Sequence, residues 1–240
     1  MNRRDFIKAA GAGTAGLALS SWVRADNPVT AEHSRPNILL ILSDDHSYPH
    51  LGCYNNPDIK TPNLDKLAAQ GMRFDRAYVM CPQCVPSRAS IMTGRSPISI
   101  QMTRFSAPLP KDIGTYPEVL KAEGYFTGVA GRTYHLDGAT KGDENLNRVF
   151  NKYELRTFSQ RLDYVKTAGT RPDMLLQYRE FLDLAQKGPG SGKPFFLQLC
   201  FSDPHRPLDS NAIPEPHDPA KLKLPVHYPD TPAVRADFAR

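Results

Sequence analysis

The sequence has no apolar run of 18 or more residues beyond its N-terminus, no internal repeat and no low-complexity tract. A helix that spans a bilayer needs about 20 mostly apolar residues, so we expect no membrane span. With 40% hydrophobic and 23% charged residues over 240 positions, the composition is ordinary for a globular protein of one or two domains.

Clustered positive charge is also scarce once the N-terminus is set aside. Residues 1–25 contain four Lys or Arg and one Asp, and so carry +3 of the formal net charge of +5, which leaves +2 for the rest. A protein that binds nucleic acid usually presents a dense Lys/Arg stripe. Its absence after residue 25 excludes nucleic acid as an expected partner.

Cysteines are few: Cys53, Cys81, Cys84 and Cys200. The spacing of Cys81 and Cys84 suits zinc or a redox pair, but no second Cys or Cys/His pair of similar spacing follows, which argues against a structural zinc site. Nothing else in the sequence supports a redox site. Cysteines of an exported protein can form disulfides, and the sequence leaves the pairing of Cys53, Cys81 and Cys200 open.

The N-terminus resembles an export signal. Arg3 and Arg4 precede a weakly apolar stretch rich in Gly and Ala, and Ala25 offers a small residue for cleavage. This pattern is typical of twin-arginine (Tat) export, and so much glycine disfavours the alternative of an amphipathic helix. We therefore expect a signal peptide over 1–25, a linker over 26–35, a folded part over 36–240, and a periplasmic or secreted protein.

Beyond the linker, apolar runs alternate with capped amphipathic segments, which predicts an α/β fold with a largely parallel sheet. The 171–188 helix carries an apolar stripe that includes Met174 and Leu175, and we expect this stripe to face the core. Residues 137–170 are polar and are expected to form surface loop and short helix. The predicted strands are 37–46 (buried), 73–79, 125–131 and 194–205, and the predicted helices are 61–71, 86–94, 115–124 and 171–188.

Polar residues follow these strands. Asp44 and Asp45 end the first, Arg132 and His135 follow the third, and Asp203 and His205 follow the fourth. Ligands of open α/β sheets gather beyond the carboxyl ends of the strands, so these clusters are expected to converge. Cys84 follows the second predicted strand and joins the same group.

Adjacent carboxylates such as Asp44 and Asp45 are costly to bury without a cation, and their oxygens favour a hard ion, Ca²⁺ or Mg²⁺. The alternative is that one caps a turn and the other is solvated. Cys84 lies near a helix start, where free N–H groups favour an anion, with Arg88 about one turn along. The alternative for this thiol is a buried structural cysteine.

The histidines and Arg132 complete the candidate set. His135 and His205 each follow an apolar strand and have the pKa range of a general acid or base, although a lone histidine is more often structural. Arg132 is a fixed positive charge suited to an oxyanion.

The segment "CVPSRASIMTGR" resembles the Cys-x-Pro-Ser-Arg signature of the type I sulfatases of the alkaline phosphatase superfamily. Cys84 fits this signature, whereas Cys81 does not, because Gln83 and Val85 stand where proline and arginine are required. The segments "PNILLILSDDH" and "TPNLDKLAAQGMRFDRAYV" are also similar to the family, and the resemblance runs from about residue 35 to the end.

The resemblance implies an alkaline-phosphatase-like sandwich, with its largely parallel sheet flanked by helices. It implies that Cys84 is oxidised to Cα-formylglycine by a formylglycine-generating or sulfatase-maturating enzyme. One Ca²⁺ ion would then be bound by Asp44, Asp45 and the formylglycine. One hydroxyl of the hydrated aldehyde attacks sulfur, and the other allows collapse to the aldehyde with release of sulfate.

The family's remaining roles transfer to single positions. Arg88 would hold the formylglycine and the metal site, His135 would act as the base that expels sulfate, and His205 would bind sulfate and help to protonate the leaving group. Most sulfatases have a lysine in a Gly-Lys-x-His pattern. This chain has Arg132 in place of that lysine, and two residues rather than one stand between Arg132 and His135. An arginine fork still binds sulfate.

The substrate implied is a sulfated carbohydrate. The segments "PFFLQLCFSDPHRP" and "YPDTPAVRADFAR" resemble the heparan N-sulfatase branch (N-sulfoglucosamine sulfohydrolase), while "LGCYNN" and the "GRTYH" spacing are similar to iduronate-2-sulfatases. Two alternatives remain: a phosphoester hydrolase of the same superfamily, and an inactive fragment or sulfated-glycan binder.

The resemblance also implies a longer protein. The family's second half supplies an Asp-Asn pair for calcium and a lysine for sulfate, and no aspartate after Asp203 is followed by asparagine here. We therefore expect that the C-terminal part of the catalytic domain is missing, that turnover by residues 26–240 is low, and that one flank of the sheet is exposed.

Overall fold

The computed structural model describes residues 35–103, 108–133, 136, 148, 150–167, 171–205 and 216–239. Residues Arg35–Arg240 form one compact unit. The expected signal peptide, nearly all of the linker and His135 lie outside the described residues.

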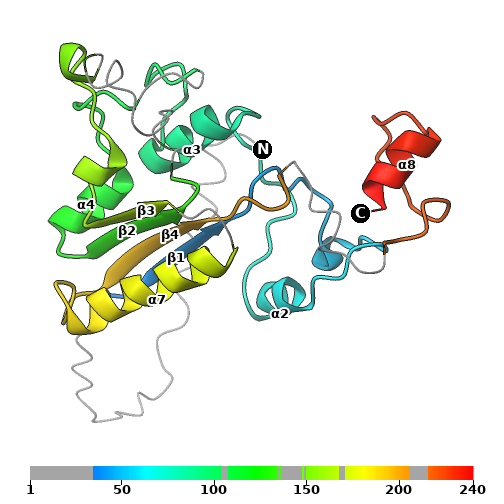
Figure 1. Cartoon of the computed structure of the whole chain (residues 1–240), viewed down its shortest axis with the longest axis horizontal. Helices are drawn as coiled ribbons and strands as arrows, with labels where there is room; N and C mark the ends of the chain where they lie inside the picture. The colour runs from blue at the N-terminus through cyan, green and yellow to red at the C-terminus, as the bar shows by residue number, and fades with distance from the viewer. Residues whose placement is uncertain are drawn as a thin grey trace, which may run out of the picture. The chain divides into compact units, whose positions relative to one another are not determined.

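A four-stranded parallel sheet forms the centre of this unit, in the order β1-β4-β2-β3 (Figure 1). The strands are β1 (Ile38–Leu42), β2 (Phe126–Gly131), β3 (Tyr164–Thr167) and β4 (Phe195–Cys200). The predicted α/β class with a parallel sheet is confirmed. Because all strands point the same way, their carboxyl ends meet at one edge.

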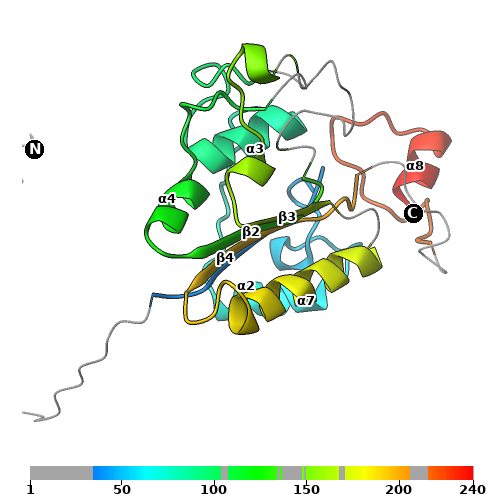
Figure 2. The same cartoon turned by 60° about the vertical axis from the view of Figure 1, so that its left-hand side comes forward.

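Helices cover the two faces of the sheet (Figures 1 and 2). Helix α7 (Arg171–Lys187) packs on one face, and α3 (Cys84–Thr93) and α4 (Tyr116–Ala122) lie on the other. The apolar core is correspondingly divided in two. The α7 side contains Phe126, Ala130, Tyr164, Met174, Phe181, Ala185, Leu197 and Leu199. The α3 side contains Val85, Ala89, Met92, Ile100, Met102, Leu109, Val129, Leu136, Phe158, Leu162 and Cys200.

Local sequence explains where the helices begin. Thr115 and Glu118 form a reciprocal capping box at α4. Helix α2 (Pro62–Gln70) follows Thr61 with proline in its first turn, and α8 (Pro232–Phe238) is capped by the Thr231 hydroxyl. Two short 3₁₀ helices complete the set, η1 (Gly52–Tyr54) and η2 (Phe158–Gln160). Helix α3 begins at Cys84 itself, two residues before its expected start.

The strand predicted over 73–79 is wrong. Residues 72–80 form bends and irregular chain in the structure, and the large apolar side chains of Phe74, Tyr78 and Val79 are exposed. A strand needs a backbone partner, and this segment pairs with none of the four strands. Cys84 therefore follows irregular chain rather than a strand.

A strand was also missed, because β3 lies within the polar region 137–170 that was expected to be loop. Residues 203–205 and 216–231 form turns and irregular chain, and α8 begins at Pro232.

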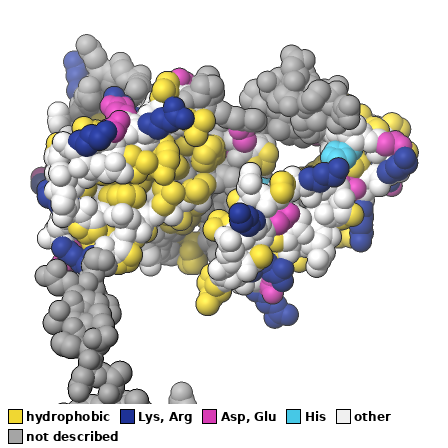
Figure 3. All heavy atoms as spheres, turned by 90° about the horizontal axis from the view of Figure 1, so that it is seen from below, with side chains coloured by type: hydrophobic (Ala, Val, Ile, Leu, Met, Phe, Trp, Pro, Cys, Tyr) yellow, Lys and Arg dark blue, Asp and Glu magenta, His cyan; other side chains and the backbone are white. Residues whose placement is uncertain are grey.

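Strand β1 is less buried than its continuous apolar run predicts. In β1, Leu39 and Ile41 are 42% and 55% exposed, so only one face of this predicted buried strand is covered. Leu175 of α7 is 57% exposed and does not face the core, contrary to expectation. Exposed hydrophobic side chains gather on the side of the molecule that carries α7 (Figure 3).

Arg161 connects several segments on the α3 side of the sheet through hydrogen bonds. Its buried guanidinium donates to Glu118 Oε2 at 2.8 Å and to the carbonyl oxygens of Ile113 and Pro110, each at 2.8 Å. Burial by itself opposes ionisation of Glu118, but the hydrogen bond and charge of Arg161 outweigh it and lower the pKa of this carboxyl.

Arg161→Met should lower the free energy of unfolding by about 3–5 kcal/mol, because Glu118 and the carbonyls would lose their buried donor. Arg156 is the matched control: it also contacts Glu118, at 3.0 Å, but its side chain is 41% exposed. Arg156→Met should cost no more than about 1 kcal/mol. Urea denaturation compares the two, and equal losses would contradict this role of Arg161.

Gly131 ends β2 where the backbones of β2 and β4 approach closely. Its φ of 94° lies in the left-handed region, and a Cβ there would overlap the carbonyl oxygen of Cys200 and Met174 Sδ. The same Cys200 oxygen accepts a hydrogen bond from Arg132 N at 2.9 Å. Glycine at 131 therefore permits the contact that fixes the backbone of Arg132.

Gly131→Ala should destabilise the fold by about 3 kcal/mol or more, from backbone strain and overlap together. A Cβ at Gly114 would meet nothing within 4 Å, so Gly114→Ala should change stability by no more than about 1 kcal/mol. Thermal unfolding of both variants checks this, and a tolerated Gly131→Ala would show that the strand ends can separate.

Candidate functional site

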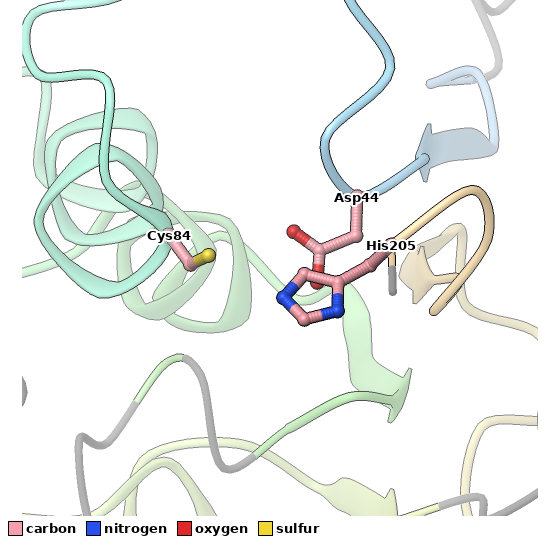
Figure 4. A group of neighbouring side chains, drawn as sticks. All are labelled: Asp44, Cys84 and His205. Atoms are coloured by element: carbon pink, nitrogen blue, oxygen red, sulfur yellow. The ribbon is translucent and has the colours of Figure 1, made fainter. Parts of the chain in front are cut away.

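Three side chains converge at the carboxyl edge of the sheet (Figure 4). Asp44 follows β1, His205 follows β4, and Cys84 begins α3. One ligand atom from each lies within 4.8 Å of the other two. The backbone helps to hold this arrangement, since the Asp44 backbone N–H donates to the backbone carbonyl oxygen of Asp203 at 3.1 Å.

Asp44 is the buried centre of the site, with its side chain 4% exposed. Arg132 Nη1 donates to Asp44 Oδ2 at 2.6 Å, and Arg88 Nη2 lies 3.3 Å from Oδ1. Each oxygen of the carboxylate therefore faces a guanidinium group. The sequence placed Asp44, Arg88 and Arg132 in one site but did not predict that both arginines would contact the same carboxylate.

Asp45 differs from its neighbour in exposure and backbone. Its side chain is 59% exposed and its φ of 57° is left-handed, a conformation that Asp tolerates better than most residues. Its Oδ2 lies 3.6 Å from His205 Nε2. The turn at Asp45 thus keeps a second carboxylate beside the first on the solvent side.

Cys84 is half-buried at the N-terminus of α3, and its side chain points toward Asp44 (Figure 4). Burial, followed by the negative charges of Asp44 and Asp45, raises the pKa of this thiol. The thiol is therefore held in its neutral form, which is unlike an activated cysteine nucleophile. Cys81, Cys53 and Cys200 are also free thiols in the structure.

Arg88 rests on a buried polar layer that the sequence did not point to. Gln198 Nε2 lies 3.1 Å from Cys200 Sγ, and both residues belong to β4 beneath the site. Among the described residues, Arg88 Nη1 and Gln198 Oε1 are buried without a hydrogen-bond partner. An unpaired buried guanidinium N–H is costly, and suits an oxygen ligand beside Arg88.

Of the seven predicted site residues, six are described and lie together: Asp44, Asp45, Cys84, Arg88, Arg132 and His205. His135 lies outside the described residues. Arg132 occupies the edge of the site, but its guanidinium is engaged with Asp44.

Two family models match the chain. The model described as Sulfatase matches residues 36–223. The model described as the twin-arginine translocation pathway signal sequence matches residues 1–20, so the chain carries an address for export across the cytoplasmic membrane. No helix within the described residues is long and apolar enough to cross a membrane.

Individual proteins agree with the first match. The chain is 43% identical to arylsulfatase A of Bos taurus over 135 residues, which cover 54% of this chain and 25% of the relative. It is 28% identical to iduronate 2-sulfatase of Mus musculus over 254 aligned positions, covering 90% of this chain and 45% of the relative.

A solved structure has the same fold. The structure of Ps i-CgsB in complex with k-i-k-neocarrahexaose matches 73% of this chain and 47% of its own length, with a TM-score of 0.56 and 26% identity. The chain thus spans between a quarter and about half of the length of the proteins that it matches.

Proposed function

Because the chain belongs to the sulfatase family, we propose that the protein hydrolyses sulfate esters of a glycan at the site formed by Asp44, Cys84 and His205. The observation that carries the proposal is the position of Cys84. The one cysteine that fits the Cys-x-Pro-Ser-Arg signature is also the one whose side chain meets a buried aspartate and a histidine.

We propose that Cys84 is converted to formylglycine by a maturation enzyme before export. The hydrated aldehyde supplies a hydroxyl nucleophile and a second hydroxyl that permits release of sulfate. The match of Cys84 to the Cys-x-Pro-Ser-Arg signature supports this.

The carboxylates fit a calcium ion. Asp44 and Asp45 offer hard oxygen ligands, and Arg88 and Arg132, which both contact Asp44, supply two positive charges to the site before any ion binds. A bound Ca²⁺ would leave the site with net positive charge, which suits a sulfate group. We propose that Asp44, Asp45 and the converted residue 84 hold this ion.

The remaining side chains are assigned by charge and position. Arg88 has a buried N–H without a partner, and we propose that this N–H donates to an oxygen of the converted residue 84 and so orients it. Arg132 holds the Asp44 carboxylate, and its fixed positive charge is assigned to the sulfuryl oxygens of the substrate. His205 binds sulfate and protonates the leaving oxygen, and His135 is proposed as the base that accepts a proton from residue 84.

The substrate class proposed is a sulfated polysaccharide or its fragments, close to the heparan N-sulfatase and iduronate-2-sulfatase branch. Two comparisons support a glycan: the relative that covers 90% of this chain is an iduronate 2-sulfatase, and the matched structure holds k-i-k-neocarrahexaose. The proposal includes both O-sulfate and N-sulfate as bonds to be tested.

The test is a paired assay of the protein in a full-length context, produced with a maturation enzyme and calcium. Sulfated glucosamines and aryl sulfates are compared with the corresponding phosphate esters. Faster hydrolysis of the sulfate esters is expected. Faster hydrolysis of the phosphate esters would replace this proposal with a phosphoester hydrolase, and binding of sulfated glycans without any hydrolysis would replace it with a glycan-binding role.

A further inference from the structure

Before any conversion of Cys84, the site contains two donors that calcium does not favour, a thiol and an imidazole, beside its carboxylates. The thiol Sγ of Cys84, a ring nitrogen of His205 and a carboxylate oxygen of Asp44 lie within 4.8 Å of one another. Sulfur, imidazole nitrogen and carboxylate oxygen together are a ligand set typical of zinc, whereas calcium takes 6–8 oxygens. The unconverted and converted forms of this site therefore differ in the metal that they suit.

We propose that the unconverted protein binds one Zn²⁺ or similar borderline-soft cation through Cys84, His205 and Asp44. The inference rests on the proposed function only in treating residue 84 as convertible, since the zinc site itself needs nothing but the chain as translated. Conversion of Cys84 replaces its sulfur with oxygen, and thereby removes the ligand that favours zinc.

The geometry is close to what such an ion requires. Zinc bonds of about 2.0–2.3 Å in a tetrahedron put neighbouring ligand atoms roughly 3.3–3.8 Å apart. The three atoms in this cluster need to approach by about 1.5 Å at most, which rotations of the half-buried Cys84 and His205 side chains allow. Asp45 Oδ2, 3.6 Å from His205 Nε2, already lies at ligand spacing and can fill a fourth position.

The charges are compatible with binding. The Cys84 thiol gives its proton to solvent as the Zn–S bond forms, so that Zn²⁺ meets one thiolate and the carboxylates of Asp44 and Asp45. Arg88 and Arg132 contact the Asp44 oxygens and stay in place, because each carboxylate oxygen has a second lone pair for the ion. No oxidant or other reactant is needed.

The test uses protein expressed without a maturation enzyme, with mass spectrometry to confirm cysteine at position 84. Titration with Co²⁺ should produce a thiolate-to-cobalt charge-transfer band in the near ultraviolet, and Zn²⁺ added at one equivalent should remove it. Cys84→Ala and the closer isostere Cys84→Ser should both lose the band, and zinc affinity should fall by about 100-fold or more. Cys81→Ala should keep the charge-transfer band and the zinc affinity of the wild type.

Absence of the cobalt band in the wild type would overturn the inference, as would its survival in both Cys84 variants. Loss of the band in Cys81→Ala would move the ion to the Cys81–Cys84 pair, and would also overturn it. Failure of the proposed function is separate: matured protein that lacks formylglycine or sulfate ester hydrolysis would refute that proposal while leaving zinc binding by the cysteine form unaffected.

Discussion

In a full-length context, Cys84→Ala should abolish sulfate ester hydrolysis by the matured protein, with a loss in kcat on the order of 10⁴-fold or more. An alanine cannot be converted to an aldehyde, so the site would lose its nucleophile while Asp44, Arg88 and Arg132 keep their contacts. Because the Cys84 side chain is only half-buried, the thermal stability of the variant should stay close to that of the wild type.

Cys81 provides the matched control for this experiment. It lies three residues earlier, is also a free and half-buried thiol, and does not fit the signature. Cys81→Ala should retain activity within about threefold, a change in barrier of less than 1 kcal/mol. Comparable losses in the two variants would contradict the assignment of Cys84 as the nucleophile position.

Asp44→Asn and Asp45→Asn should both reduce calcium-dependent activity by about 100-fold or more, but only the first should also destabilise the fold. Asp44 is buried between Arg88 and Arg132, and Asp44→Asn removes the negative charge that both guanidinium groups contact, at a cost of about 3–5 kcal/mol. Asp45 is exposed, and asparagine accepts its left-handed backbone.

Thermal unfolding with and without calcium separates the two effects. Calcium that binds the folded wild type should raise its melting temperature, and both variants should lose this increase. Without calcium, Asp45→Asn should melt like the wild type and Asp44→Asn at a lower temperature. Full activity and an unchanged calcium response in Asp45→Asn would contradict its role as a ligand.

The parts of the fold that the sequence predicted have strong local causes. The apolar run of β4 and the Thr115–Glu118 capping box of α4 determine their own elements and were found. β3 has only four residues and lies in a polar region, so its strand character depends on pairing with β2. Residues 73–79 have strand-like composition, but a strand also needs a partner, which composition does not supply.

The site likewise contains residues that the sequence predicted and contacts that it did not. Asp44, Arg132 and His205 were predicted from their position after apolar strands, because parallel strands bring their ends to one edge. The contact of both Arg88 and Arg132 with the same carboxylate depends on how far α3 lies from β1 and β2, which no local pattern encodes. The buried Gln198 and Cys200 beneath Arg88 read as ordinary strand residues in the sequence.

The central claim, that residue 84 is converted, is tested most directly by mass spectrometry of the peptide that contains it. The protein should be expressed with and without a formylglycine-generating or sulfatase-maturating enzyme, and digested. With the enzyme, the peptide should carry an aldehyde in place of the Cys84 thiol, should react with a hydrazide probe, and should still contain unmodified Cys81. A peptide that keeps both thiols under these conditions, in a protein that nevertheless hydrolyses sulfate esters, would contradict the account.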